Sequence, residues 1–187
     1  MRSILLGVAM SLACVFGVSA QQRNIDTQKS KLTIHVGKTG AFSALGHEHE
    51  IHAPIHSGTA EIGAHPAVEI HVNARELRVT DKDASEKERA EVQKTMLGPE
   101  VLDSDTHQEI VFKSTAADAT GQGRWTLNGN LTLRGQTRPV SVKVTLQDGR
   151  YTGEANVKQT DFGITPPGKA GVKAKDEVKI VFDVRLS

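Results

Sequence analysis

Residues 46–52 read Gly-His-Glu-His-Glu-Ile-His, which places three imidazoles and two carboxylates within seven residues. Imidazole nitrogens bind zinc, copper and nickel, and they also act as general bases. If residues 47–56 form one strand, alternate side chains face the same side. The side with the aliphatic residues is expected to face inward: His47, His49, Ile51, Ala53 and Ile55. The other side is expected to face solvent: Glu48, Glu50, His52, Pro54 and His56.

His47 and His49 are the candidate metal ligands, because they lie two residues apart on the inner side. A useful metal site needs a third ligand, for which His107 or a carboxylate across the sheet is available. A catalytic histidine needs an orienting partner, and no recognised catalytic motif surrounds this segment, so we expect no enzymatic activity. We favour hydrogen bonds from both histidines to loop carbonyls or a ligand head group at a rim. A metal-binding or acid-responsive role is the alternative.

The elements that must position these histidines are strands, because apolar and polar residues alternate along most of the chain. The alternation is clearest in five ranges: 31–36, 68–72, 125–133, 140–146 and 178–186. Asp148-Gly149 between two such ranges is typical of a hairpin turn. We expect an all-β fold of about eight antiparallel strands closed into a barrel, which removes sheet edges and leaves room for side chains or one slender ligand.

One segment, 83–97, is rich in helix formers and is predicted to be an α-helix after the third strand. Asp83 is the expected N-cap, with Glu86 three residues later, and Gly98-Pro99 is expected to end the helix. Val92 and Met96 lie four residues apart and would share one helical face. The segment 165–171, which contains Pro-Pro-Gly, is expected to have no regular structure.

The first twenty residues have the pattern of a secretory signal peptide: Arg2, an apolar run over 4–18, and a small-residue cleavage site ending at Ala20. A membrane anchor and lipidation at Cys14 are the alternatives. Cleavage would leave residues 21–187 as one periplasmic domain without cysteine, and with 22 basic and 22 acidic side chains after the loss of Arg2. This balance does not favour a nucleic-acid partner.

Four motifs in order resemble the YceI-like family of secreted bacterial proteins. They are the strand-like Ser30–Val36, the helix end Val92–Met96 leading into 101–114, the segment Gly129–Val140, and Thr160–Ile164 before the last strand. The resemblance implies a lipocalin-like antiparallel barrel with a helix packed against it. It also implies that long isoprenoid chains, such as polyprenyl lipids or quinones, bind in an apolar tunnel.

Seven residues are the candidates for ligand binding: Phe42, Leu45, His47, His49, Phe112, Trp125 and Phe162. The aromatic and aliphatic members have plain core packing as their alternative role. Gly129, Gly153 and Ala155 fall on inward positions and are expected to leave space for a ligand. Arg134 and Arg138 are interpreted as solvated loop residues, with an anionic head group as the alternative partner.

Together with the signal peptide, the resemblance implies a periplasmic, non-enzymatic protein that carries or stores an amphiphilic isoprenoid-like lipid. Each buried CH₂ group contributes about 0.8 kcal/mol, so a long chain would bind tightly with little polar recognition. We expect a monomer or homodimer without a transmembrane segment in the mature chain, and without a metal or any cofactor besides the bound lipid.

Overall fold

The computed structural model describes residues 21–41, 48–63 and 65–187, and its main element is one antiparallel sheet. The strands are β1 (Gln21–Asn24), β2 (Lys31–Thr39), β3 (His49–His52), β4 (Ile55–Ile62), β5 (Ala67–Asn73), β6 (Arg78–Val79), β7 (Glu109–Gly121), β8 (Arg124–Leu133), β9 (Gln136–Gln147), β10 (Arg150–Lys158), β11 (Gly168–Lys169) and β12 (Val172–Val184). The helical elements are α1 (Glu86–Leu97) and the 3-10 helices η2 (Ala74–Glu76) and η3 (Gln159–Phe162). Within these residues, eight of the twelve strands have seven residues or more, which agrees with the predicted number of about eight.

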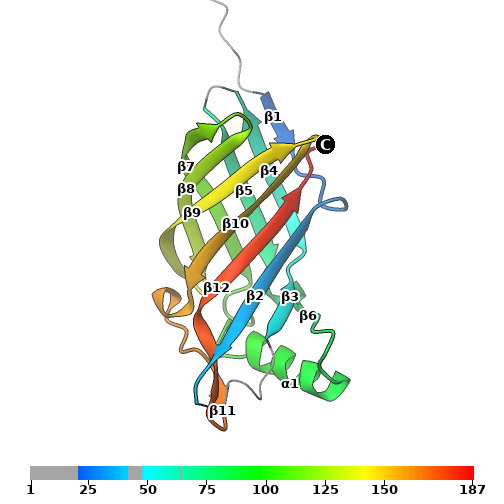
Figure 1. Cartoon of the computed structure of the whole chain (residues 1–187), viewed down its shortest axis with the longest axis vertical. Helices are drawn as coiled ribbons and strands as arrows, with labels where there is room; N and C mark the ends of the chain where they lie inside the picture. The colour runs from blue at the N-terminus through cyan, green and yellow to red at the C-terminus, as the bar shows by residue number, and fades with distance from the viewer. Residues whose placement is uncertain (1–20, 42–47, 64) are drawn as a thin grey trace, which may run out of the picture.

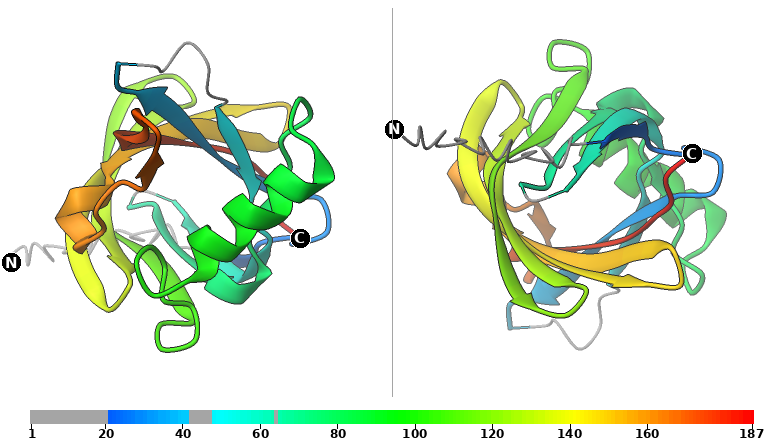
Figure 2. Two further views of the ribbon diagram at one scale, coloured as in Figure 1. Left: turned by 90° about the horizontal axis from the view of Figure 1, so that it is seen from below. Right: turned by 90° about the horizontal axis from the view of Figure 1, so that it is seen from above.

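The sheet closes on itself because β3 and β4 form one bent strand. β3 pairs with β2 and β4 pairs with β5, so the step at Ala53-Pro54 carries the chain from one edge of the sheet to the other. Between these edges, neighbouring strands pair antiparallel in the order β5, β7, β8, β9, β10, β12 and β2. Figure 2 shows the resulting ring from both ends. The predicted all-β barrel is therefore confirmed.

The end of the barrel that carries β1, uppermost in Figure 1, is called the upper end. β1 pairs with β4, and the next residue, Ile25, bridges to Leu186 just beyond β12. Ile25, Ile55 and Val184 form a small buried cluster beneath this bridge. A short strand and a few aliphatic side chains thus complete the upper end.

The lower end contains α1, β6 and β11 (Figure 1), and most of the buried core lies toward it. Leu77, which follows η2, and Phe162, the last residue of η3, are the largest fully buried side chains of the described chain, at 2% and 1% exposure. Residues 74–77 and 159–164, which lie between strands, therefore pack into the lower end and are called the plug. A barrel wall alone would leave this end open to solvent.

The predicted inner face of 47–56 is confirmed for the residues described. Ile51, Ala53 and Ile55 are buried, whereas His56 is exposed. Glu50, His52 and Pro54 differ from the expectation, because each is half-buried rather than fully exposed. The reason is that β6 pairs along the free side of β3, so His52 lies between Thr33 and Arg78 in the middle of three strands.

The helix begins two residues later than predicted and follows the sixth strand instead of the third. Its N-cap is Ser85, whose hydroxyl accepts a hydrogen bond from Glu88 N–H while the Glu88 carboxylate accepts one from Ser85 N–H. This reciprocal pair is a capping box, and it takes the place expected for Asp83 and Glu86. Gly98 ends the helix as predicted.

The segment 165–171 also departs from the prediction, because it contains β11. Gly168 and Lys169 pair with Lys173 and Val172, and Ala170-Gly171 forms the turn between them. Both turn residues have positive φ, 52° and 80°, as a tight two-residue hairpin requires. This hairpin extends the barrel wall at the lower end.

Candidate functional site

The barrel surrounds a partly open cavity of about 810 Å³. Every one of the eight long strands contributes lining side chains, and α1 adds Val92 and Met96. On β9 the lining residues are every second one: Val140, Val142, Val144 and Leu146. The alternation that predicted the strands therefore also produces the apolar wall of the cavity.

The four candidate residues that the structure describes do not form one cluster. His49, Phe112 and Trp125 line the cavity, but they belong to β3, β7 and β8, at different heights along the barrel. Trp125 pairs with Val144 near the upper end, whereas His49 pairs with Val36 toward the lower end. Phe162 does not line the cavity and is buried in the core cluster. Phe42, Leu45 and His47 lie outside the described residues.

The inward glycines do not leave free space for a ligand, contrary to expectation. A Cβ at Gly129 would lie 2.7 Å from Cζ of Phe112, and one at Gly153 would lie 2.5 Å from Cζ of Phe182. Each glycine therefore makes room for a phenyl ring from a neighbouring strand. Ala155 does line the cavity, as expected from its position on β10.

His49 is held by a buried carboxylate that the sequence did not reveal. Its Nδ1 lies 2.6 Å from Oδ2 of Asp81, whose side chain is 3% exposed. Oδ1 of Asp81 accepts a 2.6 Å hydrogen bond from the backbone N–H of Glu50. With Nδ1 engaged, Nε2 is the ring nitrogen of His49 that remains for a ligand in the cavity.

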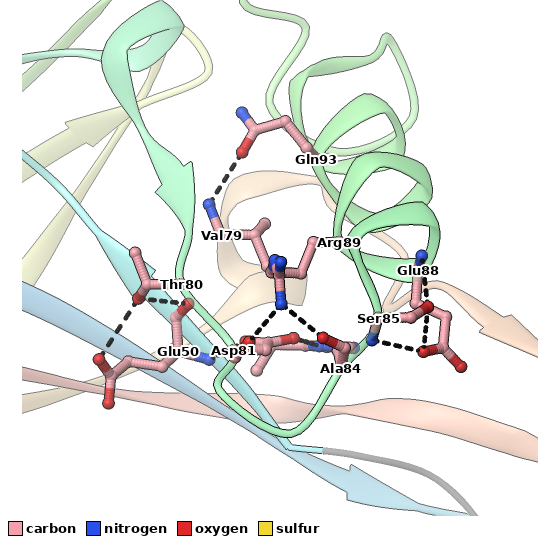
Figure 3. A network of polar contacts seen from close by, with 10 residues as sticks. Glu50, Val79, Thr80, Asp81, Ala84, Ser85, Glu88, Arg89 and Gln93 are labelled. Atoms are coloured by element: carbon pink, nitrogen blue, oxygen red, sulfur yellow. Dashed lines mark hydrogen bonds and ion pairs between the residues drawn. The ribbon is translucent and has the colours of Figure 1, made fainter.

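Asp81 is placed by the polar network that joins the β6–α1 connection to β3 and to the helix (Figure 3). Thr80 N–H donates a 2.7 Å hydrogen bond to the carbonyl of Glu50. The side-chain amide of Gln93 accepts from Val79 N–H and donates to Leu77 O, both at 2.8 Å. Arg89 of α1 donates to the carbonyl oxygen of Asp81 at 3.2 Å. The helix therefore fixes the carboxylate that orients His49.

Three lysines line the lower end of the cavity and were also missed. Lys38 ends the inward series Leu32, Ile34 and Val36 on β2, so strict alternation contained a signal for it. Lys169 and Lys173 come from the β11–β12 hairpin, where the sequence predicted no strand. No sequence signal was available for these two. Both are exposed, and the register of the hairpin places them on opposite faces.

The two arginines considered for an anionic ligand have structural partners. Arg134 donates to the carbonyl oxygens of Gly163 and Pro99, at 2.6 and 2.7 Å. Arg138 donates to Thr137 O and to the side chain of Gln136. Neither residue lines the cavity. Arg134 therefore stabilises the packing of the plug instead of binding a ligand.

Of the two kinds of third ligand considered, the structure brings a carboxylate, that of Asp81, to His49, but it does not bring His107 there. His107 lies against Gly135 of the β8–β9 turn, with Nε2 3.8 Å from Oδ2 of Asp103, and it does not line the cavity. Across the described residues, no group of three or more His, Cys, Asp or Glu side chains is arranged to hold a metal ion. In the same residues, no helix has the length and apolar character needed to cross a bilayer.

A closed antiparallel barrel around an elongated apolar cavity, with one α-helix at its lower end, defines a lipocalin-like barrel. The family model of the YceI-like domain matches residues 24–186, and the chain belongs to the YceI-like family. A UPF0312 protein of Shewanella putrefaciens is 27% identical over 174 residues, covering 87% of this chain and 85% of the relative. A UPF0312 protein of Vibrio cholerae is 25% identical over 175 residues, covering 87% and 88%.

Solved structures show the same fold. BcnA of Burkholderia cenocepacia superposes with a TM-score of 0.69 at 20% identity, covering 86% of this chain and 98% of that chain. A polyisoprenoid-binding domain from Saccharophagus degradans gives a TM-score of 0.54 at 10% identity, covering 89% and 97%. The YceI protein of Campylobacter jejuni gives 0.52 at 9% identity, covering 72% and 84%.

Proposed function

We propose that this protein binds the hydrocarbon chain of an amphiphilic, isoprenoid-like lipid inside the barrel, as a carrier or store. The observation that carries the proposal is the apolar cavity of about 810 Å³ that runs between the two ends. Its volume lies in the range of about 300–1,000 Å³ that is usual for small-molecule sites. The Saccharophagus degradans neighbour is a polyisoprenoid-binding domain, which supports the same class of ligand for this protein.

The wall of the cavity suits an unbranched or methyl-branched chain better than a polar substrate. Its middle section is formed by Val, Leu, Ile and Phe side chains from all sides, without a charged group between the two ends. Burial of each CH₂ group contributes about 0.8 kcal/mol, so affinity grows with chain length. The proposed role needs no catalytic step and no metal, and the proposed location is the periplasm after removal of residues 1–20.

Native mass spectrometry of residues 21–187, purified without a histidine tag, tests the proposal together with lipid extraction and metal analysis. We expect a bound species that extracts into organic solvent as a lipid. A stoichiometric metal without any lipid would contradict the proposal and would favour the metal-binding role of the histidines.

A pair of variants on β9 tests whether the lipid lies in the cavity. Val142 lines the cavity, whereas Thr145 is exposed on the outer face of the same strand. We expect Val142→Phe to raise the Kd for a prenol about tenfold, because the ring occupies the space of several CH₂ groups. Thr145→Phe is the matched control and should leave the Kd unchanged. Equal effects of the two variants would place the lipid elsewhere.

A further inference from the structure

We infer that His49 recognises the terminal hydroxyl of an isoprenoid alcohol by accepting a hydrogen bond at Nε2, and that Asp81 imposes this preference. The inference rests on the proposed function, which leaves open whether the head group of the lipid donates or accepts hydrogen bonds. It selects a donor, so a quinone, whose carbonyl oxygens only accept, is disfavoured. It also places the polar end of the ligand at the lower end of the cavity.

His49 differs from the other histidines in its position. Of the eight histidines, His47 lies outside the described residues, and among the other seven only His49 lines the cavity. Its neighbours on the inner face are apolar: Val36 lies opposite on β2, and Ile51, two residues further along β3, is 7% exposed. The side chain of His49 is 28% exposed. A polar ring therefore lies where the apolar wall meets the lower end of the cavity.

Asp81 determines which ring nitrogen of His49 accepts a hydrogen bond. One oxygen of this buried carboxylate accepts from Glu50 N–H and the other lies against Nδ1 of His49, both at 2.6 Å. An ionised carboxylate can only accept, so the proton of the neutral imidazole lies on Nδ1. The lone pair then lies on Nε2, the nitrogen that remains for a ligand.

The backbone around Asp81 holds the carboxylate in place. Thr80 N–H donates to the carbonyl oxygen of Glu50 at 2.7 Å, and Arg89 of α1 donates to the carbonyl oxygen of Asp81 at 3.2 Å. A rotation of the His49 ring that exchanged its two edges would break the contact with a carboxylate that is only 3% exposed. The position of the acceptor is therefore set before a ligand binds.

The preference follows from what each head group loses when it leaves water. A hydroxyl replaces a hydrogen bond to water by one to Nε2. An ether or carbonyl oxygen meets the lone pair of Nε2 instead and finds no donor on the ring, so its lost hydrogen bond to water is not replaced there. Because His49 is partly exposed, we expect the discrimination to be about tenfold.

Two ligands with the same chain test the inference: geranylgeraniol, and its methyl ether, which has no O–H group. Trp125 is the only tryptophan of the chain and lines the cavity, so its fluorescence reports both ligands. The titrations are done at about pH 8, which favours the neutral form of an imidazole. The ratio of the Kd of the ether to the Kd of the alcohol should be about tenfold larger in the wild type than in His49→Leu.

Asp81→Asn separates recognition by Nε2 from the shape of the site. The amide oxygen can still accept from Glu50 N–H, but the amide NH₂ donates to Nδ1, which moves the ring proton to Nε2. Nε2–H then donates to either ligand oxygen, so the ratio should fall to that of His49→Leu although the ring is present. A ratio that stays at the wild-type value in Asp81→Asn would overturn the inference.

His71→Leu is the matched control, because His71 is also held by carboxylates but lies on the outer wall and does not line the cavity. It should keep the ratio of the wild type. Equal ratios in the wild type and in His49→Leu would overturn the inference and leave lipid binding intact. Failure of both ligands to bind to the wild type would instead overturn the proposed function.

The same chain attached to a 1,4-benzoquinone ring tests the class of head group directly. Its carbonyl oxygens only accept, so its Kd relative to that of geranylgeraniol should respond to His49→Leu as the Kd of the ether does. A quinone that binds to the wild type more tightly than the alcohol, and loses this advantage in His49→Leu, would overturn the inference and assign Nε2 as a donor.

Discussion

Two histidines of this barrel are held by carboxylates, and they lie in regions of opposite character. At the lower end, His49 contacts Asp81, whose side chain is 3% exposed, and faces the cavity. On the outer wall, His71 of β5 contacts Glu109 at 2.8 Å and Glu69 at 3.0 Å, and Glu109 is 69% exposed. The contacts have similar lengths, so burial of the carboxylate, more than distance, determines how much each contributes to stability.

On the outer wall, neighbouring charged side chains shift one another's pKa values. The hydrogen bond that His71 donates to Glu109 raises the pKa of His71 above 6.5; burial opposes this effect, and the hydrogen bond to Glu69 adds to it. Lys113, followed by His71, lowers the pKa of Glu69 below its ordinary value. These opposite charges stabilise one another across β5 and β7, but they remain in contact with water. The lower end, in contrast, combines polar contacts with a packed core.

The two regions should differ most in how much stability is lost when a side chain is truncated. Phe162 is 1% exposed in the plug of the lower end, and Phe162→Ala should lower the free energy of unfolding by about 4 kcal/mol. Val111 lies opposite His71 on β7, and Val111→Ala should cost only about 0.5 kcal/mol. Urea denaturation of both variants measures the contrast. A similar loss at the two positions would show that the plug is not better packed than the wall.

The second-largest contrast is expected between the two carboxylates, in the stability lost when each is replaced by alanine. Asp81→Ala leaves the N–H of Glu50 and Nδ1 of His49 without their buried acceptor, which should cost about 2 kcal/mol. Glu109→Ala removes an exposed partner of His71 and should stay within about 0.5 kcal/mol of the wild type. Chemical denaturation at neutral pH provides both values. If Asp81→Ala were as mild as Glu109→Ala, burial would not be the deciding factor.

The start of α1 sharpens the comparison within the lower end itself. Ser85→Ala removes the hydroxyl that caps the helix and should destabilise the protein by about 1 kcal/mol. Asp83→Ala, two residues earlier, changes an exposed side chain outside the capping box and should change stability by less than about 0.5 kcal/mol. Thermal and urea denaturation check the pair. A larger loss of stability in Asp83→Ala than in Ser85→Ala would instead identify Asp83 as the N-cap.

The smallest expected effect is the pH dependence of the outer wall. Because the pKa of folded His71 is raised, its contribution to stability is fully present below about pH 6.5 and is lost as the pH rises through the folded value. NMR titration should place the midpoint of His71 above 6.5, and Glu109→Gln should move it down. A midpoint at or below 6.5 in the wild type would contradict the hydrogen bonds on this wall.

Local sequence patterns predicted much of the fold. The alternation of apolar residues predicted the long strands, and the inward positions of Ile51, Ala53 and Ile55 followed from parity alone. The helix was found but its cap was misplaced, because Asp83 and Ser85 both begin acceptable capping sequences, and only the contact of Ser85 with Glu88 distinguishes them. Among the site residues, His49, Phe112 and Trp125 do line the cavity, whereas Phe162 packs in the core.

The sequence by itself determined which residues face inward, since the two-residue period of a strand is a local property of the backbone. Only the tertiary structure decided what each inward residue meets. The bend at Ala53-Pro54 closes the ring, the β6–α1 connection brings Asp81 to His49 from 32 residues away, and the start of β12 brings the β11–β12 hairpin to the end of β2, where Lys173 pairs with Thr39. Such contacts depend on strand pairing and chain closure over long separations, which no local period encodes.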